Sequence, residues 1–106
     1  MISNLEKLLG TPRDGALLRY SLGLEYEKAG RAADAAAQLR EAVKRDPLYS
    51  AAWKALGRVL AEGEPAAALD AYRQGIAAAS RKGDRQAEKE MTVFARRLEK
   101  KLGGAP

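Results

Sequence analysis

The stretch WKALGRVL, at residues 53–60, places a glycine inside a segment that otherwise favours a helix. The residues around it are strong helix formers, whereas Gly57 costs a helix interior roughly 1 kcal/mol relative to alanine. A phosphate-cradling role would need a glycine-rich loop in front of a helix, and this stretch has none. We therefore predict that Gly57 lets another helix backbone come close.

Glycine and proline residues divide the whole chain into segments with a helical pattern. Between these breaks, apolar residues recur three or four positions apart, as Trp53, Leu56 and Leu60 do, and no segment alternates apolar and polar residues like a strand. The helices are predicted over residues 3–9, 14–28, 32–45, 48–61, 65–80 and 84–102. The loops between them are short, so successive helices should lie antiparallel in an all-α fold.

The residues at the segment boundaries suit helix ends. Pro65 stands in a first turn, where its missing N–H costs no hydrogen bond. Gly30 and Gly83 follow predicted helix ends, where a left-handed residue closes a helix. Asp84 is predicted to cap the last helix, and Asp14 the second.

A 34-residue repeat relates the middle segments to each other. Leu22-Gly23 and Leu56-Gly57 are 34 positions apart, and each is followed by a predicted helix with an alanine and, four positions later, a large side chain. These second-helix residues are Ala35 with Leu39 and Ala68 with Tyr72. With W-x2-L-G in WKALGRVL and L-G-x2-Y in RYSLGLEY, the pattern resembles that of the tetratricopeptide-repeat family.

This resemblance implies a right-handed α-α superhelix in which helical pairs stack. Ala35 and Ala68 are expected to offer a small surface opposite the glycines, with Tyr26 and Trp53 beside it. An alanine at Gly57 should then be tolerated, and a leucine should overpack the contact. The implied parts of one domain are a truncated helix at 2–10, repeats at 16–49 and 50–82, a capping helix at 84–102 and a disordered tail at 103–106.

The composition excludes several classes of site. The 106 residues include no cysteine and no histidine, so the chain alone supplies no disulfide, no thiolate, no histidine base and no zinc site made of these ligands. Carboxylates such as Glu88 and Glu90 are two positions apart on a helix and point apart, which makes a poor catalytic or metal-binding pair. We therefore expect no enzyme activity, no cofactor and no metal.

Nothing in the sequence suggests a membrane or an export route. No apolar run approaches the roughly 20 residues that a membrane-spanning helix needs. Residues 1–10, MISNLEKLLG, lack the basic start and the long apolar stretch of a secretory signal. We expect a cytoplasmic protein that works as a protein-interaction or scaffold module.

The resemblance also implies where a partner protein or peptide would bind. In the family, the first helix of each pair lines an inner groove that holds an extended peptide or a partner helix. Carried over to this sequence, the candidate groove residues are Tyr20, Leu24, Lys28, Lys54, Arg58 and Glu62. Tyr20 and Leu24 would form an apolar half and Lys54 and Arg58 a cationic half, suited to a partner with a hydrophobic anchor and a carboxylate.

One further reading of this groove stays open at the sequence level. Its apolar residues could pack on neighbouring helices, with its cations solvated. If the cations are exposed, reversing the charges of Lys54 and Arg58 should leave stability nearly unchanged. Leu24 stands where carboxylate-clamping family members carry asparagine, so binding of chaperone C-terminal tails is not expected.

The C-terminal segment from residue 81 to 106 is basic. It holds eight Lys and Arg against four Asp and Glu, a net charge of +4 out of +5 for the chain. This charge could attract nucleic acid or an anionic surface, or it could be the solvated face of a capping helix. Phe94 is its only aromatic residue, so base stacking has little support and nucleic acid is not the expected partner. A structural self-association module is the remaining alternative. The expected oligomeric state is a monomer or a weak homodimer.

Overall fold

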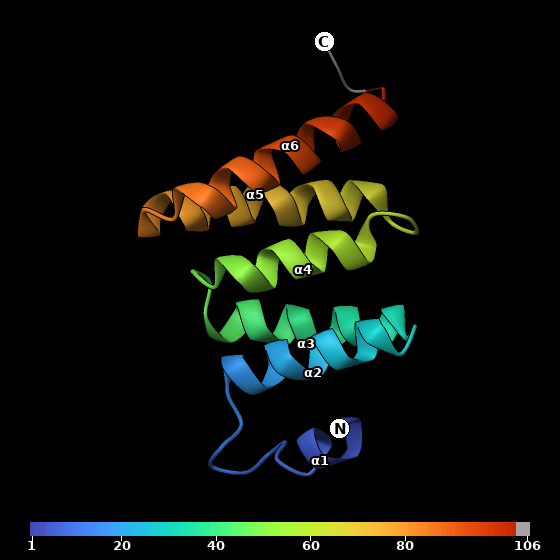
Figure 1. The fold of residues 1–106 in the computed structure, drawn as a ribbon, viewed down its shortest axis with the longest axis vertical. Coiled ribbons are helices and arrows are strands. Elements are labelled where there is room, and N and C mark those ends of the chain that lie inside the picture. Colours follow the sequence, from blue (N-terminus) through green and yellow to red (C-terminus); the bar gives the residue numbers. More distant parts are fainter. Residues whose placement is uncertain (104–106) are drawn as a thin grey trace.

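The computed structural model describes residues 1–103 and shows a stack of helices (Figure 1). In chain order the helices are α1 (Ile2–Glu6), α2 (Ala16–Lys28), α3 (Ala32–Arg45), α4 (Ser50–Leu60), α5 (Pro65–Lys82) and α6 (Arg85–Lys101). Residues 1–103 contain no strand, so the predicted all-α fold is confirmed. The disordered tail predicted at 103–106 lies, apart from Gly103, outside the described residues.

Neighbouring helices pack as antiparallel pairs that follow one another along the stack. The pairs α2–α3 and α4–α5 make the closest contacts, α3 also packs on α4, and α6 lies on α5. In Figure 1, α1 and α6 stand at the two ends of the stack. No helix within residues 1–103 has the length and apolar composition to cross a membrane.

The predicted helix boundaries are confirmed at several caps. Pro65 is the first residue of α5, and Gly30 and Gly83 have positive φ values of 76° and 73° at the ends of α2 and α5. Asp84 accepts a hydrogen bond from the backbone N–H of Ala87 at the start of α6. These residues end and begin helices for local reasons: the glycines adopt a left-handed backbone, the proline needs no N–H partner and the aspartate caps an N–H.

The N-terminal segment differs from the prediction in two ways. α1 ends at Glu6 instead of continuing to residue 9 or 10. From residue 8 onward, backbone N–H groups bond to the carbonyl three residues earlier, and the chain forms turns instead of an α-helix. Asp14 does not cap α2, whose N-cap residue is Gly15 with no side-chain bond. Its carboxylate instead accepts a bond of 2.9 Å from the backbone N–H of Gly10 and so closes this turn.

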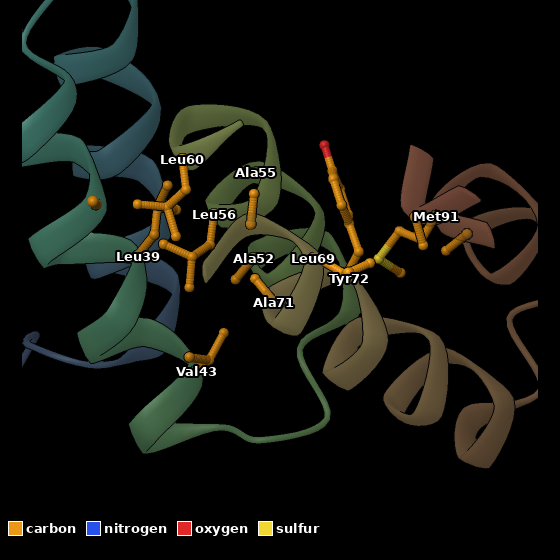
Figure 2. Close-up of a cluster of buried hydrophobic side chains, with 14 of the residues drawn as sticks. Leu39, Val43, Ala52, Ala55, Leu56, Leu60, Leu69, Ala71, Tyr72 and Met91 are labelled. Carbon is orange, nitrogen blue, oxygen red and sulfur yellow. The ribbon is translucent and has the colours of Figure 1, made fainter. Parts of the chain in front are cut away.

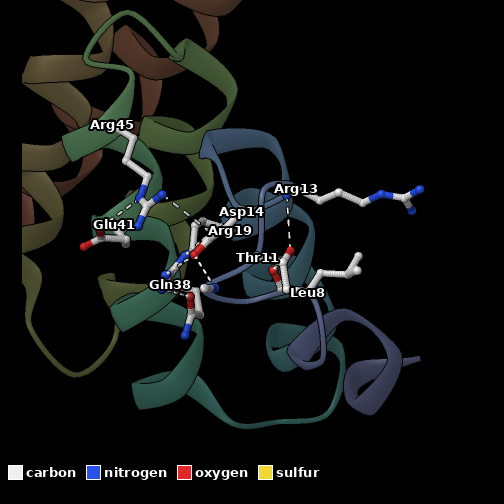
Figure 3. Close-up of polar contacts among 9 residues, drawn as sticks. Leu8, Thr11, Arg13, Asp14, Arg19, Gln38, Glu41 and Arg45 are labelled. Carbon is white, nitrogen blue, oxygen red and sulfur yellow. Dashed lines mark hydrogen bonds and ion pairs between the residues drawn. The ribbon is translucent and has the colours of Figure 1, made fainter.

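Asp14 is the centre of a polar network that ties this turn to α2 and α3 (Figure 3). Its carboxylate accepts hydrogen bonds of 2.9 Å and 2.8 Å from Nε and Nη2 of Arg19 and lies 3.6 Å from Nη1 of Arg45. Arg19 also donates to Oε1 of Gln38, and Arg45 to Glu41. The Asp14 side chain is only 7% exposed, and the bond from Arg19 holds the pKa of its carboxyl far below the usual range.

Two glycines of the repeats lie under large side chains of the second helices. A Cβ atom at Gly57 would stand 2.5 Å from Cε1 of Tyr72, and one at Gly23 would stand 2.7 Å from Cγ of Leu39. The expectation of a small opposing surface is therefore wrong for Gly57, whose three nearest atoms all belong to the Tyr72 ring. At Gly23 it holds in part, since the carbonyl oxygen of Ala35 lies 3.4 Å away.

Trp53 packs against a different glycine from the one that the sequence suggested. A Cβ atom at Gly75 of α5 would lie 2.7 Å from Cβ of Trp53 and would overlap Sδ of Met91. Met91 comes from α6 and is fully buried. The absence of a side chain at Gly75 therefore lets α4 and α6 both reach α5 closely.

The hydrophobic core runs through the stack from α3 to α6 (Figure 2). Leu39, Leu56 and Tyr72 contribute its larger buried side chains, and alanines fill the narrow spaces between helices. A smaller cluster of Leu22, Tyr26 and Ala35 lies at the N-terminal end, where Ile2 and Leu5 of α1 cover it. The short first helix thus shields an end of the stack that would otherwise be open to water.

Candidate functional site

The first helices of the pairs form the inner side of the stack. α2 contacts α4, and α4 contacts α6, whereas α3 and α5 make no contact with each other. Helices that approach one another from pair to pair lie on the short, inner side of a curved array. The candidate groove residues on α2 and α4 belong to these inner helices, as the resemblance implies.

The apolar half of this inner surface is formed by one stripe of α2. Leu17, Tyr20 and Leu24 follow one another at helical spacing. Tyr20 and Leu24 are half-buried and pack against the main core, whereas Leu17 is 69% exposed. The ring of Tyr20 lies 4.9 Å from that of Tyr49, which precedes α4, and extends the apolar surface across the boundary between the pairs.

The cations predicted for the other half are not free. Arg58 donates two hydrogen bonds of 2.7 Å, from Nε and Nη2, to the two carboxylate oxygens of Glu27 on α2. Lys54 donates a bond of 2.8 Å to Oε1 of Glu90 on α6, which lowers the pKa of the Glu90 carboxyl. The two ion pairs join α4 to the helix on each side of it, so Lys54 and Arg58, whose side chains are 31% and 49% exposed, are ion-paired as well as partly solvated.

A small pocket lies between these ion pairs and the end helix. It is lined by Lys54, Arg58, Tyr72, Glu90 and Phe94. The Tyr72 ring stands 5.5 Å from the Phe94 ring, and Figure 2 shows its hydroxyl end pointing away from the core side chains. Burial raises the pKa of Tyr72, so the hydroxyl is protonated at neutral pH.

The two remaining candidate residues lie toward the loop end of the inner helices. Lys28 is well exposed at the end of α2, with Nζ 3.6 Å from Oε2 of Glu25. Glu62 is exposed just after α4 and lines a wide hollow together with Glu27 and Arg58. Lys28 and Glu62 therefore flank the ion-paired region without forming an ion pair with it.

The sequence did not single out Glu90, Tyr72 and Phe94 as site residues, whereas Glu27 stands at a position that the family resemblance places in the groove. Each of the two carboxylates faces its cation across a helix-to-helix boundary, at separations of 31 and 36 residues. Tyr72 comes from a second helix, whose residues were assigned to packing alone. The charge pattern of neighbouring inner helices, acidic opposite basic, is the signal that could have indicated the pairs.

The groove residues include apolar side chains packed on the core and charged side chains held in ion pairs between helices. Within residues 1–103, no three His, Cys, Asp or Glu side chains are placed to share a metal ion. The polar side chains of the groove are engaged with one another across the helices. Its chemistry is that of an apolar stripe bordered by paired charges.

Comparison with known proteins points to the same family as the repeat pattern in the sequence. A sequence model of the tetratricopeptide repeat matches residues 16–59. The TPR repeat-containing protein PA0015 of Pseudomonas aeruginosa is 52% identical over 101 residues, which cover 94% of this chain and 96% of that protein. The chain therefore belongs to the tetratricopeptide-repeat (TPR) family.

Solved structures agree with this assignment. The solution structure of protein BPP2914 from Bordetella parapertussis is 41% identical, with a TM-score of 0.78 over 95% of this chain and 89% of that one. A TPR domain protein from Salinibacter ruber is 30% identical, with a TM-score of 0.75 over 83% of this chain and 89% of that one. Proteins of the family are generally non-enzymatic scaffolds for protein–protein interaction.

Proposed function

We propose that this protein is an interaction module whose inner surface binds a peptide or an extended segment of a partner protein. The observation that carries the proposal is Leu17, a leucine that is 69% exposed on the inner helix α2, in line with Leu24. An isolated exposed leucine is ordinary, but this one continues a stripe that includes the Tyr20–Tyr49 aromatic pair. We take Lys28 and Glu62 as the edge of the same surface.

The partner segment should carry an apolar side chain and a carboxylate. The apolar side chain would lie over Leu17 and Leu24. Arg58 has five N–H donors and uses two of them on Glu27, so N–H groups remain for a partner's carboxylate. Lys54 likewise has two N–H groups beyond the one that reaches Glu90. A carboxylate can therefore bind at the small pocket while both ion pairs persist.

The test selects partner-like peptides and then maps them. Peptides are selected from a displayed random library on the immobilised protein, and their affinities are measured against Leu17→Ser. This substitution replaces an exposed side chain, so the fold should stay intact. Leu102→Ser, at an exposed apolar residue just after α6, is the matched control. We expect selected peptides to lose binding to Leu17→Ser and to keep binding to Leu102→Ser; the reverse pattern would remove the site from the inner surface.

The proposal includes a cytoplasmic location and a monomer or weak homodimer. Sedimentation across a range of protein concentrations separates these states from a self-association module. A mass that rises to a stable dimer, together with loss of peptide binding on dimerisation, would favour self-association as the main role of the inner surface.

A further inference from the structure

The last helix occupies the place of a first helix whose pair is not completed within residues 1–103. Ser50 begins α4 and Arg85 begins α6, 35 residues later, and α6 packs on α5 as α4 packs on α3. α2 and α4 are each covered on their other side by the second helix of their own pair. Figure 1 shows α6 at the end of the stack, with α5 on one side of it. One face of α6 is thus left open at a place where the fold elsewhere packs a helix.

The residues on this open face are polar. At the same 35-residue shift, Leu56 corresponds to Met91, and each is buried against the preceding second helix. Gly57, which faces the second helix of its own pair, corresponds to Thr92. The same shift relates Trp53 to Glu88. The open face therefore lacks the aromatic residue and the glycine that would hold a tightly packed apolar helix.

Cations dominate the open face instead. Arg85, Lys89, Arg96 and Lys100 follow one another at helical spacing along α6 and are exposed. Within residues 1–103, none of the four forms an ion pair, in contrast to Lys54 and Arg58 on the inner surface. The stripe therefore presents cations that form no ion pair within residues 1–103 over about four helical turns, with the Glu88 carboxylate beside them.

An open hollow adjoins this stripe. Its volume is about 760 Å³, and it lies between the C-terminal end of α5 and the outer face of α6. Val93, 47% exposed, and Thr92 line it on α6, and Ser80 lines it on α5. An apolar side chain placed there would contact Val93 while the cations surround it.

We propose that the open face of α6 docks an acidic amphipathic helix from a partner protein. The carboxylates of that helix lie one turn apart, opposite Arg85, Lys89, Arg96 and Lys100. One of its apolar side chains enters the hollow beside Val93. A helix matches the face because both have the same repeat along their axes, and because the fold packs helices at the equivalent places in the other pairs.

The same features argue against other occupants of this face. No aromatic side chain within residues 1–103 lines the hollow to stack on a base, which argues against single-stranded nucleic acid. A second copy of the chain would bring the same cations against themselves in a symmetric contact. Because the face is separate from the inner surface, the inference does not rest on the proposed function.

The test uses a designed helical peptide as the probe. The peptide carries glutamates at i, i+4, i+7 and i+11 with one leucine between them, and a control peptide has the same composition in scrambled order. Binding is measured by fluorescence anisotropy on the full chain. Lys89→Glu with Arg96→Glu should weaken binding by about tenfold or more, since like charges then face each other. The matched control, Arg97→Glu with Lys101→Glu, makes the same charge change on another side of α6 and should weaken it by less than about threefold, the effect of a distant screened charge.

A third variant separates docking from general attraction. Val93→Asn keeps the charge and removes the apolar contact, so it should weaken the ordered peptide and leave the scrambled peptide unchanged. Equal binding of the two peptides, or equal losses in the two charge-reversal variants, would overturn the proposal. Single-stranded RNA and phosphatidylserine vesicles are measured alongside; tighter binding of either than of the ordered peptide would also overturn it and reassign the face to that anion.

Discussion

The ring of Tyr72 lies directly over Gly57, so close that a Cβ atom on the glycine would stand 2.5 Å from Cε1 of the ring. Tyr72 is buried, and its ring touches Phe94 of α6 on the other side. The glycine in WKALGRVL therefore makes room for a particular side chain. The large residue of the second helix is held between two first helices because one of them has no side chain there.

The first prediction corrects the expectation that alanine is tolerated at this position. Gly57→Ala gains helix propensity of about 1 kcal/mol but forces the buried Tyr72 ring to move. We expect a net loss of roughly 1–2 kcal/mol in the free energy of unfolding, and a larger loss for Gly57→Leu, as overpacking a core costs about 1–3 kcal/mol. Urea unfolding measures the free energy of unfolding of both variants. In Gly57→Ala with Tyr72→Leu, the loss should be smaller than the sum of the two single losses; additive losses would show that the glycine and the ring do not share the space.

The second prediction concerns the network around Asp14. Its folded-state pKa is lowered mainly by the hydrogen bond from Arg19. The contribution to stability is therefore present above the unfolded-state pKa of about 3.9 and is lost as the pH falls through the lower folded-state value. Asp14→Asn should be less stable than the wild type at neutral pH, and the difference should shrink in strong acid. Thermal unfolding from neutral to strongly acidic pH measures this difference.

A matched control makes the acid test specific. Asp70→Asn removes an exposed carboxylate of α5 that forms no ion pair within residues 1–103. It should follow the wild type across the pH range. If both variants show the same pH dependence, the network does not carry the acid sensitivity of the N-terminal turn.

The third prediction concerns the docking of α1. The hydroxyl of Tyr26 donates a hydrogen bond to the Glu6 carboxylate, and this bond, with burial, raises the pKa of Tyr26. The neutral phenol is thus favoured in the fold, so its contribution is complete below about pH 10 and is lost as the pH rises through the folded-state pKa. Difference titration of tyrosinate absorbance between the wild type and Tyr26→Phe should show a midpoint above 10. Glu6→Gln should move that midpoint down, and an unchanged midpoint would rule out the bond as its cause.

The order and type of the helices could be predicted from the sequence, because their causes are local. Gly30, Gly83 and Pro65 act through their own backbone geometry, and the apolar spacing within a segment does not depend on the rest of the chain. The partner of Gly57 could not be predicted in this way. It depends on how α4 and α5 pack against each other, which brings the Tyr72 ring over the glycine.

The candidate site was predictable to a similar extent. The resemblance to the family placed Tyr20 and Leu24 on an inner helix, and both lie on α2. The pairs Arg58–Glu27 and Lys54–Glu90 depend on how far one pair of helices is rotated against the next. That rotation is set by buried contacts such as that of Gly75 with Met91, which no property of a single segment reveals.

The last prediction uses the ion pair between Arg58 and Glu27 to separate stability from binding. Arg58 is 49% exposed, so the pair should contribute at most about 1 kcal/mol. Arg58→Glu alone removes the ion pair and places two carboxylates side by side. The protein should therefore unfold at a lower temperature, whereas the sequence alone predicted that charge reversal leaves stability nearly unchanged. The exchange of both residues, Arg58→Glu with Glu27→Arg, restores an ion pair of opposite direction and should recover most of that loss. If a partner's carboxylate binds beside Arg58, the exchanged protein should fold well and yet bind selected acidic peptides several-fold more weakly. Calorimetric melting and peptide titration on the same three proteins measure the two effects separately, and full binding by the exchanged protein would exclude Arg58 from the site.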